Sequence, residues 1–350
     1  MLLGMTRVTA EQLATARGCV LGLMLGDAIG ATAGTAPAGG ALRATSAGQL
    51  ACFTIDGIIR ANVRGMHKGI CHPPSVVWHA YTRWAAMQGI PGIKRWQEED
   101  WPDGWLAQVP ALGKRRGSAP ATVSALQAQP VLGDGDRTWT STGAHGLTRT
   151  LPAGLIRWWG PEPGRFAAEV AATTHGPEAA DAAALAATVI SNIIAGRNIE
   201  EATERAQREC QSLVRVMNDQ PLSPAVHAAR DTPRQAAALA QLCPDARAAS
   251  ALAGAVYVAL SFPDREQLGD ALLFAASVPY GRHVAATVGA FLGAAHGVDA
   301  LPIAWVSRME LAWVADVLAR DLVTEFVDGP SGSEYSDATD PHWWDRYPGW

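Results

Sequence analysis

Hydrophobic residues recur three and four positions apart along most of the chain. This spacing places the apolar side chains on one face of a helix. No hairpin or alternating strand pattern competes with it, so the sequence predicts an all-α protein. The expected helices cover residues 8–30, 47–65, 74–89, 166–175, 178–195, 199–217, 232–242, 246–260, 265–277, 283–296 and 302–326.

Residues 90–165 depart from this pattern, because glycine, proline and tryptophan are frequent there. We expect loops with short helices, and long loops that carry aromatic side chains are more often functional than idle. The tryptophans of this region are Trp96, Trp101, Trp105, Trp139, Trp158 and Trp159. Farther along, residues 180–245 carry mixed charges, which we interpret as a solvated outer face. One helix there is expected to start after Asp231, with Pro233 in its first turn.

Four glycines recur at every fourth residue of the first expected helix. Gly18, Gly22, Gly26 and Gly30 would lie along one edge of that helix, where a second backbone can come very close. Asp27 stands inside the same apolar segment, and a buried carboxylate needs hydrogen-bond or charged partners. Asp27 is therefore either a paired structural residue or an acid that forms part of a site.

Residues 18–30, GCVLGLMLGDAIG, resemble the opening signature of the ADP-ribosylglycohydrolase family, whose first core helix ends in a glycine–aspartate pair. Further similar segments are KRRGSAPATVSAL (114–126), STGAHGLTRTLPAGL (141–155), TTHGP (173–177) and AATVGAFLGAAHG (285–297). The resemblance implies a compact orthogonal helical bundle like that of the dinitrogenase-reductase-activating glycohydrolases, and a divergent bacterial member. In this family a pair of divalent cations, usually magnesium, and a carboxylate base help water to release ADP-ribose.

Both clusters of metal-binding acids of that family are missing here. The second helix of the family begins with threonine–aspartate–aspartate–threonine, whereas residues 45–48 of this chain are TSAG. The turn that supplies the other acids corresponds to residues 279–283, PYGRH. Hard cations need oxygen ligands, chiefly carboxylates, so we expect no metal and no other cofactor. Arg282 brings a permanent positive charge to this place. Our hypothesis is that Arg282 partly replaces the metal by pairing with Asp27 or with an anionic ligand.

The resemblance also indicates which residues would bind a ligand. Gly143, Gly146 and Arg149 keep the pattern of a loop that in the family lies against diphosphate and ribose. His145 departs from it and either blocks the pocket or lines a changed one. His175 either orients a ligand or interacts with carbonyl groups at a helix end. The full expected set is Asp27, Ser46, Gly143, His145, Gly146, Arg149, His175, Tyr280, Arg282 and His283.

A basic loop precedes this region. Lys114, Arg115 and Arg116 stand next to Gly117 and Ser118. Such a loop either meets a phosphate, through its side chains and a helix N-terminus, or is simply solvated.

Composition excludes several other classes of protein. With 48% hydrophobic and 17% charged residues, the chain is typical of a folded globular protein. A net charge of −5 gives no reason to expect binding to nucleic acid or to an anionic membrane. The five cysteines contain no CxxC pair, and the first residues do not resemble a secretory signal. We therefore expect a cytoplasmic protein without a disulfide framework.

The end of the chain is rich in aromatic residues. We expect a helical domain over residues 1–327, a flexible polar joint at 328–333, and an aromatic tail within 328–350. The rings of Trp343, Trp344, Tyr347 and Trp350 would be costly to expose together. The tail is therefore expected to pack on the domain or to bind a partner protein.

Three functions remain open. The first, which we favour, is a pseudoenzyme that binds ADP-ribose, a nucleotide or another phosphorylated small molecule without metal-dependent hydrolysis. The second is a repurposed, metal-independent enzyme that uses the same cavity. Its candidate catalytic residues are Asp27, Asp56, His145, Tyr280 and His283. The third is a structural or interaction protein.

Overall fold

A computed structural model describes residues 7–33, 39–95, 101–128, 139–156, 162–218 and 220–349. Over these ranges the chain forms helices and turns with isolated β-bridges and no strand, so the predicted all-α fold is confirmed. The α-helices are α1 (Ala10–Gly30), α2 (Ser46–Lys68), α3 (Pro73–Met87), α4 (Pro120–Ala128), α5 (His145–Thr150), α6 (Pro163–Ala172), α7 (Pro177–Ile194), α8 (Ile199–Glu209), α9 (Ser223–Asp231), α10 (Ala236–Leu242), α11 (Ala248–Ser261), α12 (Leu268–Ala276), α13 (Gly281–His296), α14 (Ile303–Val306), α15 (Ala312–Val327) and α16 (Trp343–Arg346). The short 3₁₀ helices are η1 (Trp105–Gln108), η2 (Pro110–Gly113), η3 (Leu151–Leu155), η4 (Arg265–Gln267) and η5 (Val298–Ala300).

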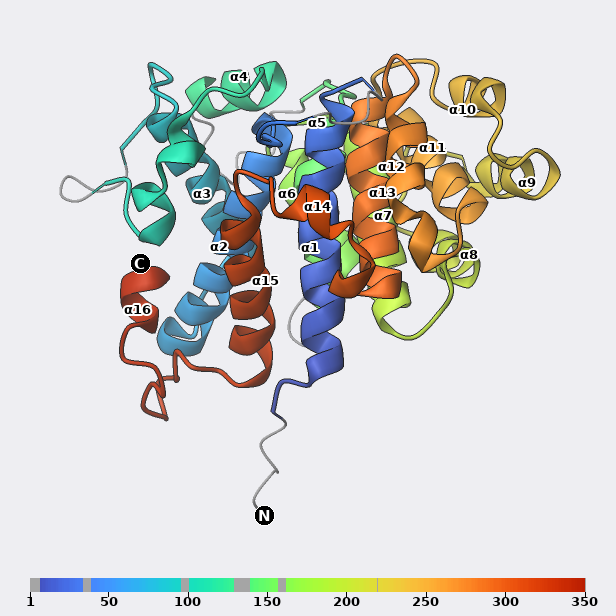
Figure 1. Cartoon of the computed structure of the whole chain (residues 1–350). Coiled ribbons are helices and arrows are strands. Elements are labelled where there is room, and N and C mark those ends of the chain that lie inside the picture. The colour runs from blue at the N-terminus through green and yellow to red at the C-terminus, as the bar shows by residue number, and fades with distance from the viewer. Residues whose placement is uncertain are drawn as a thin grey trace.

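Helix α1 runs through the middle of the molecule (Figure 1). It packs most extensively against α13 and also contacts α15 and α2. Helices α2, α3 and α15 lie on one side of α1, and α11, α12 and α13 lie on the other (Figure 1). Two helices at the centre of the bundle therefore come from the start and the end of the sequence.

The glycines of α1 form the contact with α13. A Cβ atom added at Gly18 or Gly22 would overlap the backbone carbonyl of Gly293 or Gly289, respectively. At Gly30 an added Cβ would lie 2.6 Å from the Cα of Arg282. The two backbones thus touch along the whole length of the contact, as the spacing of the glycines predicts.

The expectation of a solvated outer face over residues 180–245 is wrong for α7, whereas many residues from 200 to 245 are exposed. Most residues of α7 are buried, because this helix packs between α6 and α8 and also contacts α11 and α13. The helix expected over 199–217 ends at Glu209, and the amides of Arg215, Val216 and Met217 all donate to the carboxylate of Asp181. A buried acceptor on α7 thus holds this segment in a turn.

Two further helix boundaries also differ from the prediction. The helix expected over 232–242 starts only at Ala236, and α9 precedes it. Between the two helices, the Tyr257 hydroxyl donates to the Thr232 carbonyl and accepts from the Gln235 amide. The helix expected over 302–326 is divided into α14 and α15. There the backbone of Leu42 exchanges hydrogen bonds with Arg308 and Glu310. In both places a distant residue competes with the helical hydrogen bonds.

The tail folds back on the helices as far as residue 349. Trp343 and Tyr347 are buried, and the Tyr347 hydroxyl donates to Asp321 Oδ2 at 2.6 Å. The expected flexible joint is wrong at Ser331, which is fully buried and donates to Glu325. Trp350, like Trp96, Trp158 and Trp159, lies outside the described residues.

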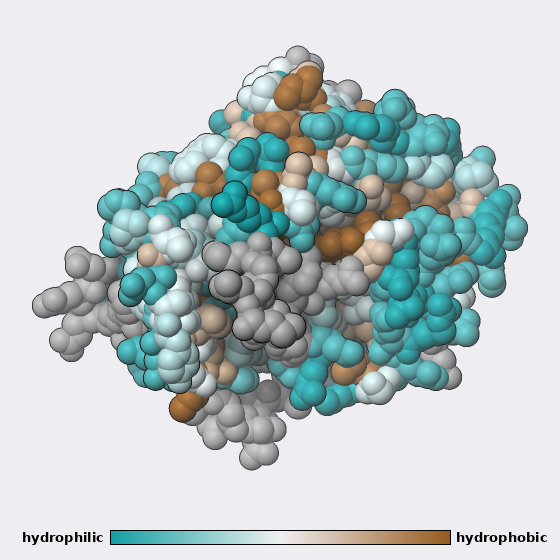
Figure 2. All heavy atoms as spheres, turned by 90° about the horizontal axis from the view of Figure 1, so that it is seen from below, coloured by the Kyte–Doolittle hydropathy of each residue, from teal (hydrophilic) through white to brown (hydrophobic). Residues whose placement is uncertain are grey.

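The surface seen in Figure 2 is mostly hydrophilic, with hydrophobic residues in small separate patches. Helix α1 is long and apolar enough to cross a membrane by length and composition, but 78% of that stretch is buried inside the protein. We therefore treat α1 as the core helix of this bundle.

Replacing Gly22 with Ala should destabilise the protein by about 3 kcal/mol or more, because the new methyl group meets backbone that cannot move aside. The matched control is Gly65→Ala in α2, where the nearest atom, Cys71 Cβ, would be 3.8 Å away. That change should be neutral or stabilise by up to about 1 kcal/mol. Urea unfolding of both variants measures the difference, and equal effects would contradict the close contact of α1 with α13.

A second prediction concerns the carboxyl of Glu325, which is 2% exposed and accepts hydrogen bonds from Asn62 and Ser331. Burial raises its pKa to about 7 from an ordinary value of 4.5. As the pH rises from 4.5 to 7, the unfolded chain ionises first, so the folded state loses stability. Between pH 5 and pH 8 the wild type should lose about 2 to 3 kcal/mol relative to Glu325→Gln. Parallel unfolding free energies of the two proteins across this range would refute the prediction.

Candidate functional site

Six segments meet at one end of α1. They are the last turn of α1, the first turn of α2, residues 114–119, α5, the turn after α6, and the first turn of α13. The contacts that join them run from Asp27 to Thr45, from Ser46 to Ser118, from His145 to Arg282 and His283, and from Gly146 to His175. This is the place where the sequence predicts a ligand site.

Asp27 is fully buried and accepts hydrogen bonds from Thr45 at the start of α2. The Thr45 amide donates to its Oδ2 at 2.6 Å, and the Thr45 hydroxyl donates to its Oδ1 at 2.7 Å. Burial raises the pKa of Asp27, while these hydrogen bonds and the charge of Arg282 act against that rise. Of the two partners expected for Arg282, Asp27 forms no direct pair with it; both carboxylate oxygens of Asp27 accept from Thr45. Asp27 is thus a hydrogen-bond acceptor at the start of α2.

The remaining amides of the first turn of α2 also have protein acceptors. The Ser46 amide donates to the Arg116 carbonyl at 2.9 Å, and the Ala47 amide donates to the Thr45 hydroxyl. The Ser46 hydroxyl donates to the Ser118 carbonyl at 3.3 Å. Residues 114–118 therefore cover the start of α2 and leave it no free donor in these groups for an anion.

The basic side chains of that loop are also engaged. Arg116 pairs with Glu310 at 2.6 Å, and Arg115 donates to the carbonyl of Gln88 at 3.1 Å. The loop thus uses these two arginines to hold itself in place, while Lys114 and Arg115 are exposed at the surface. Phosphate binding by this loop stays a prediction.

Arg282 forms the cationic centre of the site. Its Nη2 atom lies 3.1 Å from Nε2 of His283 and 3.5 Å from Nε2 of His145. Because arginine only donates, Nε2 of His283 accepts, and its Nδ1 donates to the Thr148 hydroxyl at 2.8 Å. The rings of His145 and His283 meet edge to face, with centroids 4.9 Å apart. Arg282 and His145 are partly exposed, whereas His283 is buried.

All three histidines of the site are neutral at pH 7. Burial, together with the charges of Arg282 and Arg149, lowers the pKa of His145 to about 3. Burial and Arg149 lower the pKa of His175 to about 2. Burial and the neighbouring His145 hold the pKa of His283 well below its usual value. The permanent charge of Arg282 therefore dominates this end of the site.

Arg149 is fully buried. Its guanidinium donates to the hydroxyls of Thr122 and Thr174 and lies over the ring of Tyr81. The Thr174 hydroxyl also contacts Nδ1 of His175 at 2.7 Å. Arg149 and His175 thus support the site from inside, and His175 bonds a threonine hydroxyl rather than helix-end carbonyls.

The two glycines of the predicted anion loop use their amides within the protein. The Gly143 amide donates to the Ser141 hydroxyl, and the Gly146 amide donates to the Gly143 carbonyl. Gly146 instead makes room for His175, whose ring would lie 3.0 Å from an added Cβ. Close packing thus requires a glycine at 146, whereas the space around Gly143 would accept a Cβ atom.

One of the candidate catalytic residues, Asp56, lies apart from this cluster. Asp56 is ten residues beyond Ser46 on α2, about 15 Å along the axis, and its carboxylate pairs with Arg60 and Arg83. The Tyr280 side chain is 44% exposed at the start of α13. Asp56 is therefore wrong as a member of this site. The sequence did not indicate Thr45 and Thr148 as the partners of Asp27 and His283, because such pairings depend on how the helices pack.

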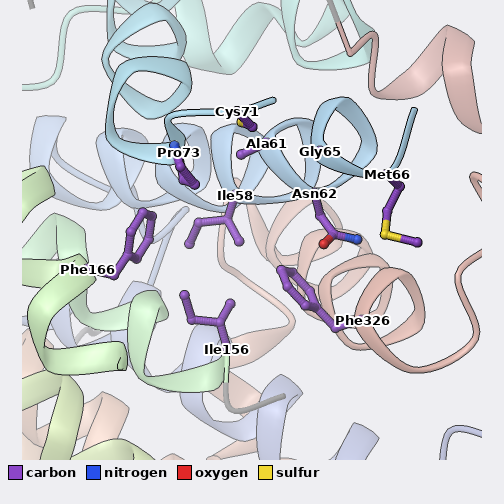
Figure 3. A pocket seen from close by; sticks show the side chains of 10 residues that line it. All are labelled: Ile58, Ala61, Asn62, Gly65, Met66, Cys71, Pro73, Ile156, Phe166 and Phe326. Carbon is purple, nitrogen blue, oxygen red and sulfur yellow. The ribbon is translucent and has the colours of Figure 1, made fainter. Parts of the chain in front are cut away.

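A cavity of about 240 Å³ lies between α2, α6 and α15. Figure 3 shows Ile58, Ile156, Phe166 and Phe326 turned toward one another across it, with Asn62 at its side. The described residues of its walls include no acid, arginine or histidine.

The comparison with known families is decisive at this point. A model of the ADP-ribosylglycohydrolase family matches residues 9–331 of the chain. The protein belongs to the ADP-ribosylglycohydrolase family. One solved structure with this fold is described as an ADP-ribosylglycohydrolase-related protein complex. It has a TM-score of 0.60 at 19% identity, over 90% of this chain and 99% of that chain. No curated protein gives a significant match.

The site of this ADP-ribosylglycohydrolase family member does not fit a pair of magnesium ions. Among the described residues, no group of three or more histidine, cysteine or acidic side chains is placed to hold a metal ion. Asp27 is engaged by Thr45, and the Ser46 hydroxyl donates to a carbonyl. A divalent cation would also face the guanidinium of Arg282. The donor set lacks the carboxylates that such an ion needs.

Proposed function

We propose that this protein binds the phosphate part of ADP-ribose, a nucleotide or a related small molecule at Arg282, without metal-dependent hydrolysis. The observation that supports this most is the place of Arg282, with its Nη2 beside the neutral rings of His283 and His145. A permanent cation among neutral groups attracts an anion and repels a metal ion.

The backbone adds to this preference. Arg282 and His283 are the second and third residues of α13, so their amides have no acceptor within the helix. The helix dipole also favours negative charge at this end. The guanidinium and these amides are donors suited to a phosphate.

The histidines favour binding over catalysis. A general base works best with a pKa near the working pH, whereas the pKa of His145 is about 3. With Asp56 in ion pairs elsewhere, the alternative of a repurposed acid–base enzyme has little support. The interaction-protein alternative would use the tail, but Trp343 and Tyr347 are already buried in the protein.

Calorimetric titration with ADP-ribose in the presence of a chelator tests the proposal. We expect binding to the wild type and a loss of affinity of about tenfold or more in Arg282→Ala, since a charged hydrogen bond is worth about 1.5–3 kcal/mol. Arg165→Ala, which removes an exposed arginine paired with Glu169, should leave the affinity unchanged.

Two outcomes would overturn this function. One is equal affinity of the wild type and Arg282→Ala. The other is release of ADP-ribose from ADP-ribosyl-arginine or ADP-ribosyl-serine that stops when a chelator is added.

A further inference from the structure

We propose that a second phosphate site lies between α2, α3 and residues 348–349. Arg60, at this site, is 14 residues beyond Ser46 on α2, which is about 21 Å along the helix axis. A pocket of about 420 Å³ opens there, and its walls include Arg60, Arg64, His79 and Arg83. The site takes a phosphate group, either free or as a monoester. It does not depend on the proposed function of Arg282.

A buried ion network forms the floor of this pocket. Arg60 is 2% exposed and donates to Asp56 at 3.1 Å and to Asp103 at 2.8 Å. Arg83, which is 6% exposed, donates to Asp56 at 2.6 Å. Two arginines thus face two aspartates, and the network by itself carries no net charge.

One donor of this network lacks a partner. Nε of Arg83 is buried without a hydrogen bond among the described residues, and the nearest carboxylate oxygen of Asp103 is 3.6 Å away. An unpaired donor on a buried arginine costs free energy unless a ligand accepts from it. Arg83 lines the pocket, so its guanidinium belongs to the wall that an oxyanion there would face.

Arg64 gives the pocket its positive charge. It follows Arg60 by one helical turn and donates to the Gly349 carbonyl at 3.3 Å, and no carboxylate pairs with it in the described part of the chain. Arg60, Arg64 and Arg83 against Asp56 and Asp103 leave one more positive than negative charge among these described groups. Burial together with Arg83 and Arg64 lowers the pKa of His79 to about 4, in agreement with a positive field.

The other walls would suit an organic group. Ile70, Trp101 and Pro348 also line the pocket. Its volume lies in the range typical of small-molecule sites. A phosphate monoester would place its charged end at Arg64 and Arg83 and its organic part against these residues.

Titration with inorganic phosphate and with AMP tests this site, and Arg282→Ala serves as the background so that the first site does not contribute. We expect both probes to bind that protein. Adding Arg64→Ala should weaken binding about tenfold or more, whereas adding Arg64→Lys should retain most of it. The matched control is Arg205→Ala, an exposed arginine paired with Glu209, which should change nothing.

The outcomes separate the two sources of phosphate. If AMP binds more tightly than inorganic phosphate, the apolar wall contacts the organic part of a phosphate monoester. If the two bind equally, the site takes the free phosphate ion.

Two results would overturn the proposal. One is the absence of millimolar binding, and the other is an affinity that Arg64→Ala leaves unchanged in a protein of equal thermal stability. Failure of this site would leave the test at Arg282 untouched.

Discussion

The contact between α1 and α13 is the constraint on which the site depends. Glycines of α1 bring its backbone onto that of α13, and the last of them, Gly30, lies against the Cα of Arg282. This contact sets Asp27 at the end of α1 beside the first turn of α13. A larger side chain along this line would separate the two helices and, with them, the groups that form the site.

The chemistry at this place follows from two changes acting together. Without the acids, Asp27 finds its partners in Thr45 and becomes part of the protein's own hydrogen bonding. Arg282 supplies positive charge there; its guanidinium donates to His283, whose other ring nitrogen bonds the Thr148 hydroxyl. In the function proposed above, a side chain that cannot lose its proton takes the place of a metal pair. The family's fold is kept, while the groups at this end of the bundle differ from the family's acids.

Much of the fold could be predicted from the sequence. The four glycines of α1 indicated a close backbone contact, and the apolar spacing indicated most helices to within a few residues. The boundaries that failed share one cause, since Asp181 and Tyr257 bind backbone groups far away in sequence. Helix propensity depends on neighbouring residues in the sequence, whereas these competing hydrogen bonds come from residues far away in it.

The sequence indicated which segments meet at the candidate site, but only some of the side-chain contacts within it. The residues at 279–283 pointed to Arg282 and His283, because a motif of fixed spacing marks their position. The burial of Arg149 and the pairing of Asp56 with two arginines depend on which helices meet. The pocket beside Arg64 and Arg83 could not be predicted for the same reason, since these two arginines lie on different helices.

The exchange of a metal pair for a fixed cation can be tested most directly by anomalous diffraction from crystals soaked in manganese chloride. We expect no anomalous peak in the space between Asp27, Ser46 and Arg282. Two manganese peaks beside Ser46 and Arg282 would contradict this account.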